Sequence, residues 1–63
     1  MELKMGTVVA VPSPERADVE IDGVVIEDVT CLSNAEPTAD FGCWLAVLGN
    51  GRYLLIGMVG VGI

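Results

Sequence analysis

The sequence predicts a small all-β barrel formed by a single domain, residues 1–63. Five short segments rich in valine, isoleucine and leucine follow one another at intervals of about 8–12 residues, a spacing typical of small barrels and sandwiches. Turn-forming residues separate these segments, and no segment has the 3.6-residue apolar period of a helix. A chain of this length forms one domain near the lower size limit for a self-sustaining core. Closure into a barrel removes sheet edges that would otherwise pair with foreign strands.

The first two predicted strands cover residues 5–11 and 17–22. The first is rich in valine and ends before Pro12, because proline has no amide hydrogen to donate inside a sheet. In the second, apolar and acidic residues alternate strictly, so we expect one face in the core and the other in water. The two sets are Ala17, Val19 and Ile21, and Asp18, Glu20 and Asp22. The acidic set offers oxygen ligands of the kind that calcium uses, but we favour an ordinary solvated face.

The third predicted strand covers residues 24–32 and follows an Asp-Gly turn signal at residues 22–23. Its apolar residues change parity midway, and a β-bulge near Glu27 and Asp28 would bring them onto one face. Residues 33–40 form a polar loop, the one place where the sequence favours a short helix or 3₁₀ turn.

The last two predicted strands, residues 43–48 and 53–59, flank a Gly-Asn-Gly turn at residues 49–51 and form a β-hairpin. Both strands are apolar on both faces, whereas a closed barrel has one interior. We expect another surface to cover the outward set, because large exposed apolar patches are rare on monomers. Each run is too short to cross a bilayer as a helix, so we predict a protein partner and no membrane contact. Residues 60–63 are expected to extend the last strand or to lie on a neighbour.

The aromatic residues Phe41, Trp44 and Tyr53 belong to this hairpin region, and together with Leu55 they are the predicted interface residues. Large aromatic side chains anchor interfaces, but they also fill cores, so the sequence leaves both roles open for Trp44. The two alternating sets of the fourth strand are Trp44, Ala46 and Leu48, and Cys43, Leu45 and Val47. One set fills the barrel and the other lies outside it.

Charge and side-chain chemistry argue against several functions. Nine acidic residues against three basic ones give a net charge of −6, which disfavours nucleic acid, because phosphate binding needs clustered lysine and arginine. The chain has no histidine, so a serine or cysteine nucleophile lacks its usual base and we predict no catalytic residues. Cys31 and Cys43 are expected to be buried thiols rather than a disulfide or zinc ligands. We predict no cofactor and no metal.

Four segments together resemble a known family. They are residues 6–11 (GTVVAV), residues 17–23 (ADVEIDG), the strand opening at Gly42, and residues 55–57 (LIG). In this order and spacing they resemble the small OB-fold-like barrels of tail and baseplate structural proteins in tailed bacteriophages, over nearly the whole chain. One departure is Cys43, because the family has aspartate after this glycine. The apolar residue indicates a corner that is buried against a neighbour.

The resemblance implies a five-stranded OB-like or SH3-like barrel and a non-enzymatic structural protein of the virion, either a tail or a capsid-decoration component. Its partners would be copies of itself, other virion structural proteins, or both. An alternative from a different class is a nucleic-acid-binding OB module of a cellular factor, which requires a contiguous basic groove. A third is a subunit that lends only scaffold to a catalytic complex.

Overall fold

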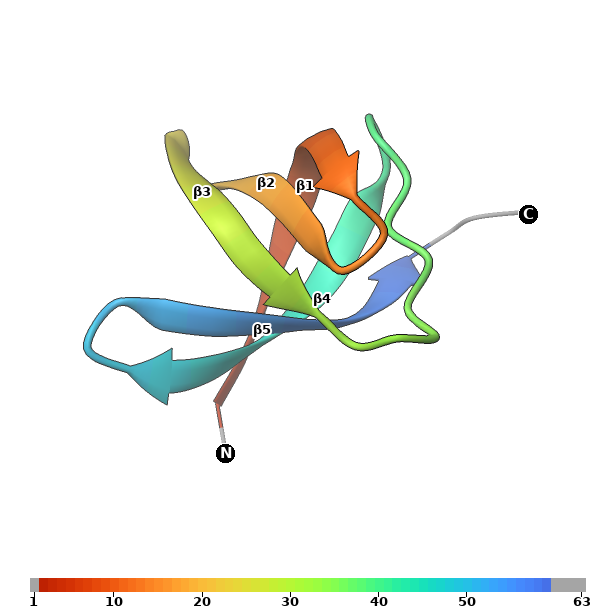
Figure 1. Ribbon diagram of the computed structural model, residues 1–63. Helices are drawn as coiled ribbons and strands as arrows, with labels where there is room; N and C mark the ends of the chain where they lie inside the picture. Colours follow the sequence, from red (N-terminus) through yellow and green to blue (C-terminus); the bar gives the residue numbers. More distant parts are fainter. Residues whose placement is uncertain (1, 60–63) are drawn as a thin grey trace.

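The computed structural model describes residues 2–59, and within them every regular element is a β-strand (Figure 1). In chain order the strands are β1 (Glu2–Ser13), β2 (Arg16–Ile21), β3 (Val24–Cys31), β4 (Gly42–Gly49) and β5 (Arg52–Val59). They close into a barrel in the order β1-β2-β3-β5-β4. The predicted small five-stranded all-β barrel is therefore confirmed. Residues 33–40 contain turns and no helix, and the expected extension at residues 60–63 lies outside the described part of the chain.

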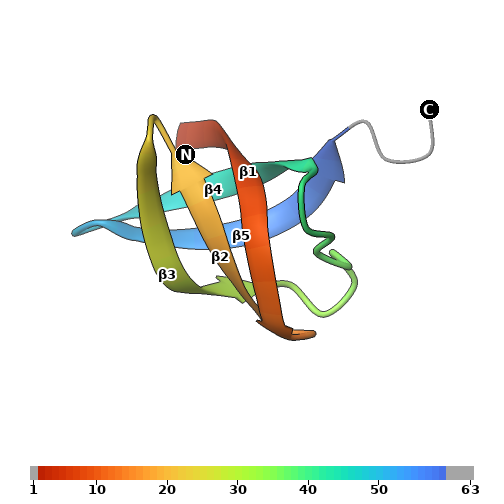
Figure 2. The ribbon, with the colours of Figure 1, turned by 90° about the horizontal axis from the view of Figure 1, so that it is seen from above.

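Strand β1 belongs to both halves of the barrel. Its first half, from Glu2 to Thr7, pairs antiparallel with β4, and from Thr7 to Ser13 it pairs antiparallel with β2. In Figure 2, β1, β2 and β3 lie side by side and cross β4 and β5 steeply, an arrangement seen where the two sheets of a small barrel pack nearly at right angles. The barrel closes because β1 reaches both sheets.

The strand β1 extends past both ends of its predicted range. It begins at Glu2 and continues through Pro12 to Ser13, so the prediction that it ends before Pro12 was wrong. The physical reason is local: the register with β2 shifts between Ala10 and Ser13, and Pro12 is exposed within this irregularity. A proline there takes no amide away from a regular ladder.

The β2–β3 hairpin contains the predicted bulge. Ala17 pairs with Val29, but Val19 pairs with Ile26, so β3 has one extra residue in between. Asp28 lies in this bulge with φ of 61°, and its amide donates a 3.0 Å hydrogen bond to the Asp18 carboxylate. Because of this extra residue, Ile26 before the bulge and Val29 and Cys31 after it all face the core.

The other strand connections use short pairings and local turns. Strands β3 and β5 run parallel and pair through Thr30 with Leu54 and Cys31 with Leu55, after which the Leu32 amide donates to the Leu55 carbonyl at 3.0 Å. In the β4–β5 turn, Asn50 and Gly51 both have positive φ, as a two-residue primed turn requires. The predicted hairpin is confirmed.

The interior is apolar throughout the described chain, which has no buried polar or charged side chain. The apolar set of β2, Ala17, Val19 and Ile21, faces the interior as predicted. On β4 the set that contains Cys43 and Leu45 faces the interior. The buried cluster is Val8, Ala17, Val19, Ile21, Val29, Cys31, Ala35, Cys43, Leu45 and Leu55. The long loop closes one end, since Asp40 donates its amide to the Val8 carbonyl at 2.8 Å and Ala35 is buried.

Gly6 lies where β1 passes from β4 to β2, and the structure leaves no room for a side chain there. An added Cβ would lie 2.8 Å from Val19 Cγ1, 2.9 Å from the Glu20 carbonyl oxygen and 3.0 Å from Leu45 Cδ1. Two of these contacts are with core side chains and one is with backbone, so relief requires a shift of the barrel wall.

We therefore predict that Gly6→Ala lowers the free energy of unfolding by about 1–3 kcal/mol, as overpacking of a core does. Gly57→Ala is the matched control, because a Cβ at this strand glycine meets no described atom within 4 Å. It should be neutral or stabilising by about 0.5 kcal/mol, since alanine reduces the entropy of the unfolded chain. Urea unfolding followed by circular dichroism measures both, and equal midpoints for the two variants would show that Gly6 is not constrained.

Candidate interaction surface

The outward side of the sheet β1–β4–β5 has an apolar area that crosses all three strands, with Thr7 beside Gly42 and Arg52 near the β4–β5 turn as its polar residues. On the centre strand β4, Trp44 has Met5 of β1 and Gly57 of β5 as its register partners. Two residues further along β4, Ala46 pairs with Leu3 of β1 and Leu54 of β5. These positions have the opposite parity to the buried Leu45, so they face outward. We call this surface the apolar face, and its members are Leu3, Met5, Gly42, Trp44, Ala46, Leu54, Gly57 and Val59. At these described positions it carries no charge.

The side chains of the apolar face already pack on one another within a single copy. Ala46 points outward and is nevertheless only 3 % exposed, because Leu3 and Leu54 lie on either side of it. In contrast, Leu3 is 49 %, Met5 53 % and Trp44 40 % exposed. The small residue Ala46 is therefore covered by its neighbours, whereas the larger side chains of the apolar face remain exposed to solvent. Contiguous exposed apolar surface of this kind is typical of protein–protein contact sites.

Of the four predicted interface residues, Trp44 lies on the apolar face. Its place on the surface removes the alternative that it fills the core. Phe41 is exposed but precedes β4, and its carbonyl accepts a 2.9 Å hydrogen bond from the Val8 amide. Tyr53 is half-buried and packs against the core beside its partner Val47.

The fourth prediction, Leu55, was wrong. Leu55 is 0 % exposed and pairs with Leu45 inside the barrel. The reason is a bulge in β5: Trp44 pairs with Gly57 and Leu45 with Leu55, so Ile56 is an extra residue that resets the parity of the strand. A residue enclosed in this way cannot contact another protein unless the barrel opens.

Sequence reasoning missed Leu3, Met5 and Leu54 as members of the surface. Leu3 lies before the predicted start of the first strand, although it alternates with Glu2 and Lys4 as a strand residue would. That alternation is the signal that would have extended the strand. Leu3 and Met5 lie beside Trp44 and Ala46 because β1 pairs with β4, and these two strands are far apart in the sequence.

The opposite wall of the barrel carries acidic side chains beside exposed valines, such as Val24 and Val25 on β3. Glu20 on β2 is exposed. The described chain has two ion pairs. One joins Lys4 Nζ to the Asp22 carboxylate at 3.6 Å, and the other joins Arg16 Nη1 to the Asp28 carboxylate at 3.8 Å. Both pairs are solvent-exposed and contribute little to stability. They nonetheless engage Lys4 and Arg16 with carboxylates, so these two cations do not form a basic groove.

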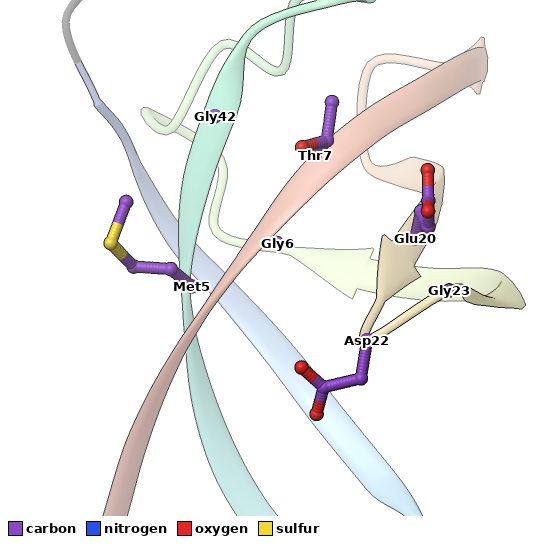
Figure 3. A pocket seen from close by; sticks show the side chains of 7 residues that line it. All are labelled: Met5, Gly6, Thr7, Glu20, Asp22, Gly23 and Gly42. Atoms are coloured by element: carbon purple, nitrogen blue, oxygen red, sulfur yellow. The ribbon is translucent and has the colours of Figure 1, made fainter.

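A shallow groove of about 360 Å³ opens where β1 and β2 diverge. It is lined by Met5, Gly6, Thr7, Glu20, Asp22, Gly23 and Gly42 (Figure 3). Figure 3 shows the Glu20 and Asp22 carboxylates pointing in different directions. Across the described residues, no group of three potential ligands lies close enough to hold a metal ion. The carboxylates of Glu20 and Asp22 therefore do not converge on one point in this groove.

The two cysteines lie inside the barrel as free thiols, as predicted. Burial raises the pKa of the Cys43 thiol, and a backbone hydrogen bond from Gly6 opposes this in part. Burial likewise raises the pKa of Cys31, against the opposing charge of Arg16. Both groups are therefore protonated at neutral pH, and a protonated, enclosed thiol is a poor nucleophile.

No family model matches the chain, and neither a curated protein nor a solved structure matches it. Within residues 2–59, no helix is long and apolar enough to cross a membrane. The functional argument therefore depends on the surfaces of this barrel.

We predict that Trp44→Glu leaves the barrel folded, whereas Leu55→Glu unfolds it. A glutamate at Trp44 reaches water, but one at Leu55 places an unpaired charge in an apolar core, which costs more than a domain of this size can offset. Circular dichroism spectra and thermal melts of the two variants provide the measurement. A folded Leu55→Glu variant, or an unfolded Trp44→Glu variant, would contradict the assignment of the two faces.

Proposed function

We propose that this chain is a non-enzymatic structural component of a tailed-bacteriophage virion, which packs repeatedly against neighbouring proteins through its apolar face. The observation that carries the proposal is the apolar face itself, with Trp44 on its centre strand β4. A contiguous apolar patch is uncommon on the outside of a barrel that works alone, whereas scattered apolar side chains are normal. An apolar layer there is explained by a neighbour that covers it.

The energetics support a contact of this kind. Burying apolar surface stabilises an association by about 25 cal/mol per Å², so a patch of a few hundred Å² supplies several kcal/mol before the costs of association. In a shell or tube each copy makes the same contact many times, and weak contacts then add up. The side chains that contribute most are the half-exposed Leu3, Met5 and Trp44.

The chemistry of the barrel supports a structural role over a catalytic one. The described interior holds no polar side chain, and both thiols are enclosed and protonated. The groove beside β1 combines glycines with two divergent carboxylates, without a nucleophile and base in contact. The virion assignment rests on the resemblance of the strand motifs to tail and baseplate barrels, together with a strand order of β1-β2-β3-β5-β4.

The direct test is the composition of purified particles. In density-gradient fractions from a culture that expresses the gene from its phage genome, quantitative mass spectrometry should detect the chain at a fixed number of copies per particle. Removal of the gene and complementation with the wild type provide the control. A chain that remains in the soluble fraction, with none in the particles, would overturn the proposed function.

A second measurement addresses the alternative of a nucleic-acid-binding module. An exposed aromatic residue on a barrel surface is the kind of group on which bases stack, and Trp44 is such a residue. We nevertheless predict no binding to single-stranded DNA, single-stranded RNA or duplex DNA up to about 100 µM, because a net charge of −6 repels phosphate. Filter binding at low salt, with Trp44 emission as a second readout, measures it. Micromolar affinity that weakens as salt rises would favour the alternative.

A further inference from the structure

We propose that the free edge of β3 at residues 24–27 pairs with an extended segment of a partner protein, in which basic and apolar residues alternate. The segment adds a strand to the β2–β3 hairpin, antiparallel to β3. This edge is not part of the apolar face, so the inference goes beyond the proposed function and does not depend on the virion role. Its supports are the unpaired backbone of the edge, the exposed apolar side chains along it, and the carboxylates beside it.

The first half of β3 is paired on one side only. Toward β2 its pairs are Val24 with Ile21, Val25 with Glu20 and Ile26 with Val19. On its other side, β3 pairs with β5 only at Thr30 and Cys31. In Figure 1 these two strands meet near the end of β3 and diverge toward its start. Within the described chain, residues 24–27 therefore have no strand on the side away from β2, and an unpaired edge is a template for a further strand.

The turn between β2 and β3 determines which backbone groups point to the free side. Asp22 and Gly23 have φ of 53° and 84°, as in a two-residue primed turn, and the residues that flank such a turn form a hydrogen-bonded pair. Hydrogen-bonded and non-hydrogen-bonded pairs alternate along an antiparallel ladder. Val24 and Ile26 therefore bond to β2, whereas the amide and the carbonyl of Val25 point away from it. The edge offers this donor and this acceptor to an added strand.

The side chains along this edge are apolar and exposed. Val24 is 59 % and Val25 50 % exposed, and Ile26 is partly buried against the core. Val24 and Ile26 lie on the inward side of β3, because their partners on β2 are buried. Residues opposite each other in an antiparallel pair share a face, so every second residue of the added segment would cover these two side chains. Those residues of the segment are therefore expected to be apolar.

A hollow next to the edge leaves room for the segment. It has a volume of about 150 Å³ and lies between residues 26–29 of β3 and residues 51–53 at the start of β5. Tyr53, which packs against the core, contributes to the β5 side of this hollow. The two strands are not packed against each other at this point, so an apolar side chain of the segment can enter between them.

The outward side of the edge is acidic. Val25 pairs with Glu20, and Glu27 lies two residues further along β3 on the same face. Both carboxylates are exposed, and neither belongs to the ion pairs of the described residues. Arg52 lines the hollow from its opposite wall. Lysine or arginine opposite Val25 and Glu27 would therefore lie beside a carboxylate, and such cross-strand pairs of opposite charge stabilise a sheet.

The same charges disfavour a second copy of this chain at the edge. Two β3 edges paired with each other would place Glu20 and Glu27 of both copies on one face of a continuous sheet. Each copy also has a net charge of −6. Like charges brought together across a contact suppress it, whereas a basic segment is attracted. The occupant that fits the edge is therefore a basic strand of another protein.

The test is titration of the full chain with a seven-residue peptide of alternating lysine and valine with blocked ends, followed by amide hydrogen exchange in NMR spectra. In the free chain we expect the Val25 amide to exchange fast, and those of Val24 and Ile26 to exchange slowly. The peptide should slow exchange at Val25 by about tenfold or more, because it accepts that hydrogen bond. A Val25 amide that is already protected in the free chain, or one that millimolar peptide leaves unchanged, would overturn the proposal.

Two N-methylated versions of the peptide separate strand addition from attraction of charge. In antiparallel pairing, the lysines opposite Val25 and Glu27 direct their amides at β3, whereas the valines between them direct their amides away. N-methyl groups on these lysines should weaken binding by about tenfold or more, since they remove donors from the ladder. The same number of N-methyl groups on valines should change it by less than about twofold. Equal effects would show that charge alone holds the peptide and would contradict the proposal.

Variants of the chain test the same edge from the other side. Val25→Pro removes the free amide without taking a hydrogen bond from β2, so the barrel should fold, as circular dichroism verifies, and peptide binding should be lost. Glu27→Lys should weaken binding by about fivefold or more, because it places like charges across the pair. Glu15→Lys is the matched control, with the same charge change at an exposed residue in the turn before β2, and it should change binding by less than about twofold. A folded Val25→Pro variant that binds the peptide, or equal effects of the two lysine variants, would overturn the proposal.

Discussion

The double pairing of β1 is the constraint on which the rest of the structure depends. One strand pairs with β4 through its first half and with β2 through its second, and the passage between them requires the glycine at position 6. This pairing closes the barrel and so creates the single interior. It also lays Leu3 and Met5 beside Trp44, so the same contact that completes the core assembles the apolar face outside it.

Local signals in the sequence predicted the features that depend on neighbouring residues. The alternation of β2, the Asn-Gly turn between β4 and β5, and the bulge at Asp28 were all predictable because each is encoded within a few residues. The bulge is a good example: Asp28 adopts positive φ, which aspartate tolerates, and the Asp18 carboxylate accepts its free amide.

The features that could not be predicted depend on strands far away in sequence. Leu55 was assigned to the surface because both faces of its strand are apolar, and only the register with β4 shows that it is enclosed. Likewise, Leu3 belongs to the apolar face only because β1 begins beside Val47 and Ala46. A single extra residue in a strand reverses the face of every residue after it, and the bulge at Ile56 is established only by the register with β4, although the neighbouring Gly57 is a local sign of one.

The division of the surface into an acidic wall and an apolar wall links the fold to the proposed role. In the proposed role the apolar face of β1–β4–β5 is the side that contacts a neighbour, whereas β2 and β3 carry most of the acidic side chains of the sheet. An exposed apolar layer is a liability for a protein that works alone, and in an assembly it supplies the association energy. The origin of the barrel in a phage tail or capsid stays a prediction.

The most direct measurement of the central claim uses the single tryptophan of the chain as its own probe. Trp44 is 40 % exposed in one copy and lies on the centre strand of the apolar face. If copies of the chain pack against one another through this face in the proposed role, acrylamide quenching of Trp44 should fall several-fold and its emission should shift to shorter wavelength as the protein concentration rises through the micromolar range. Quenching and emission that stay constant from dilute to concentrated protein would contradict the account.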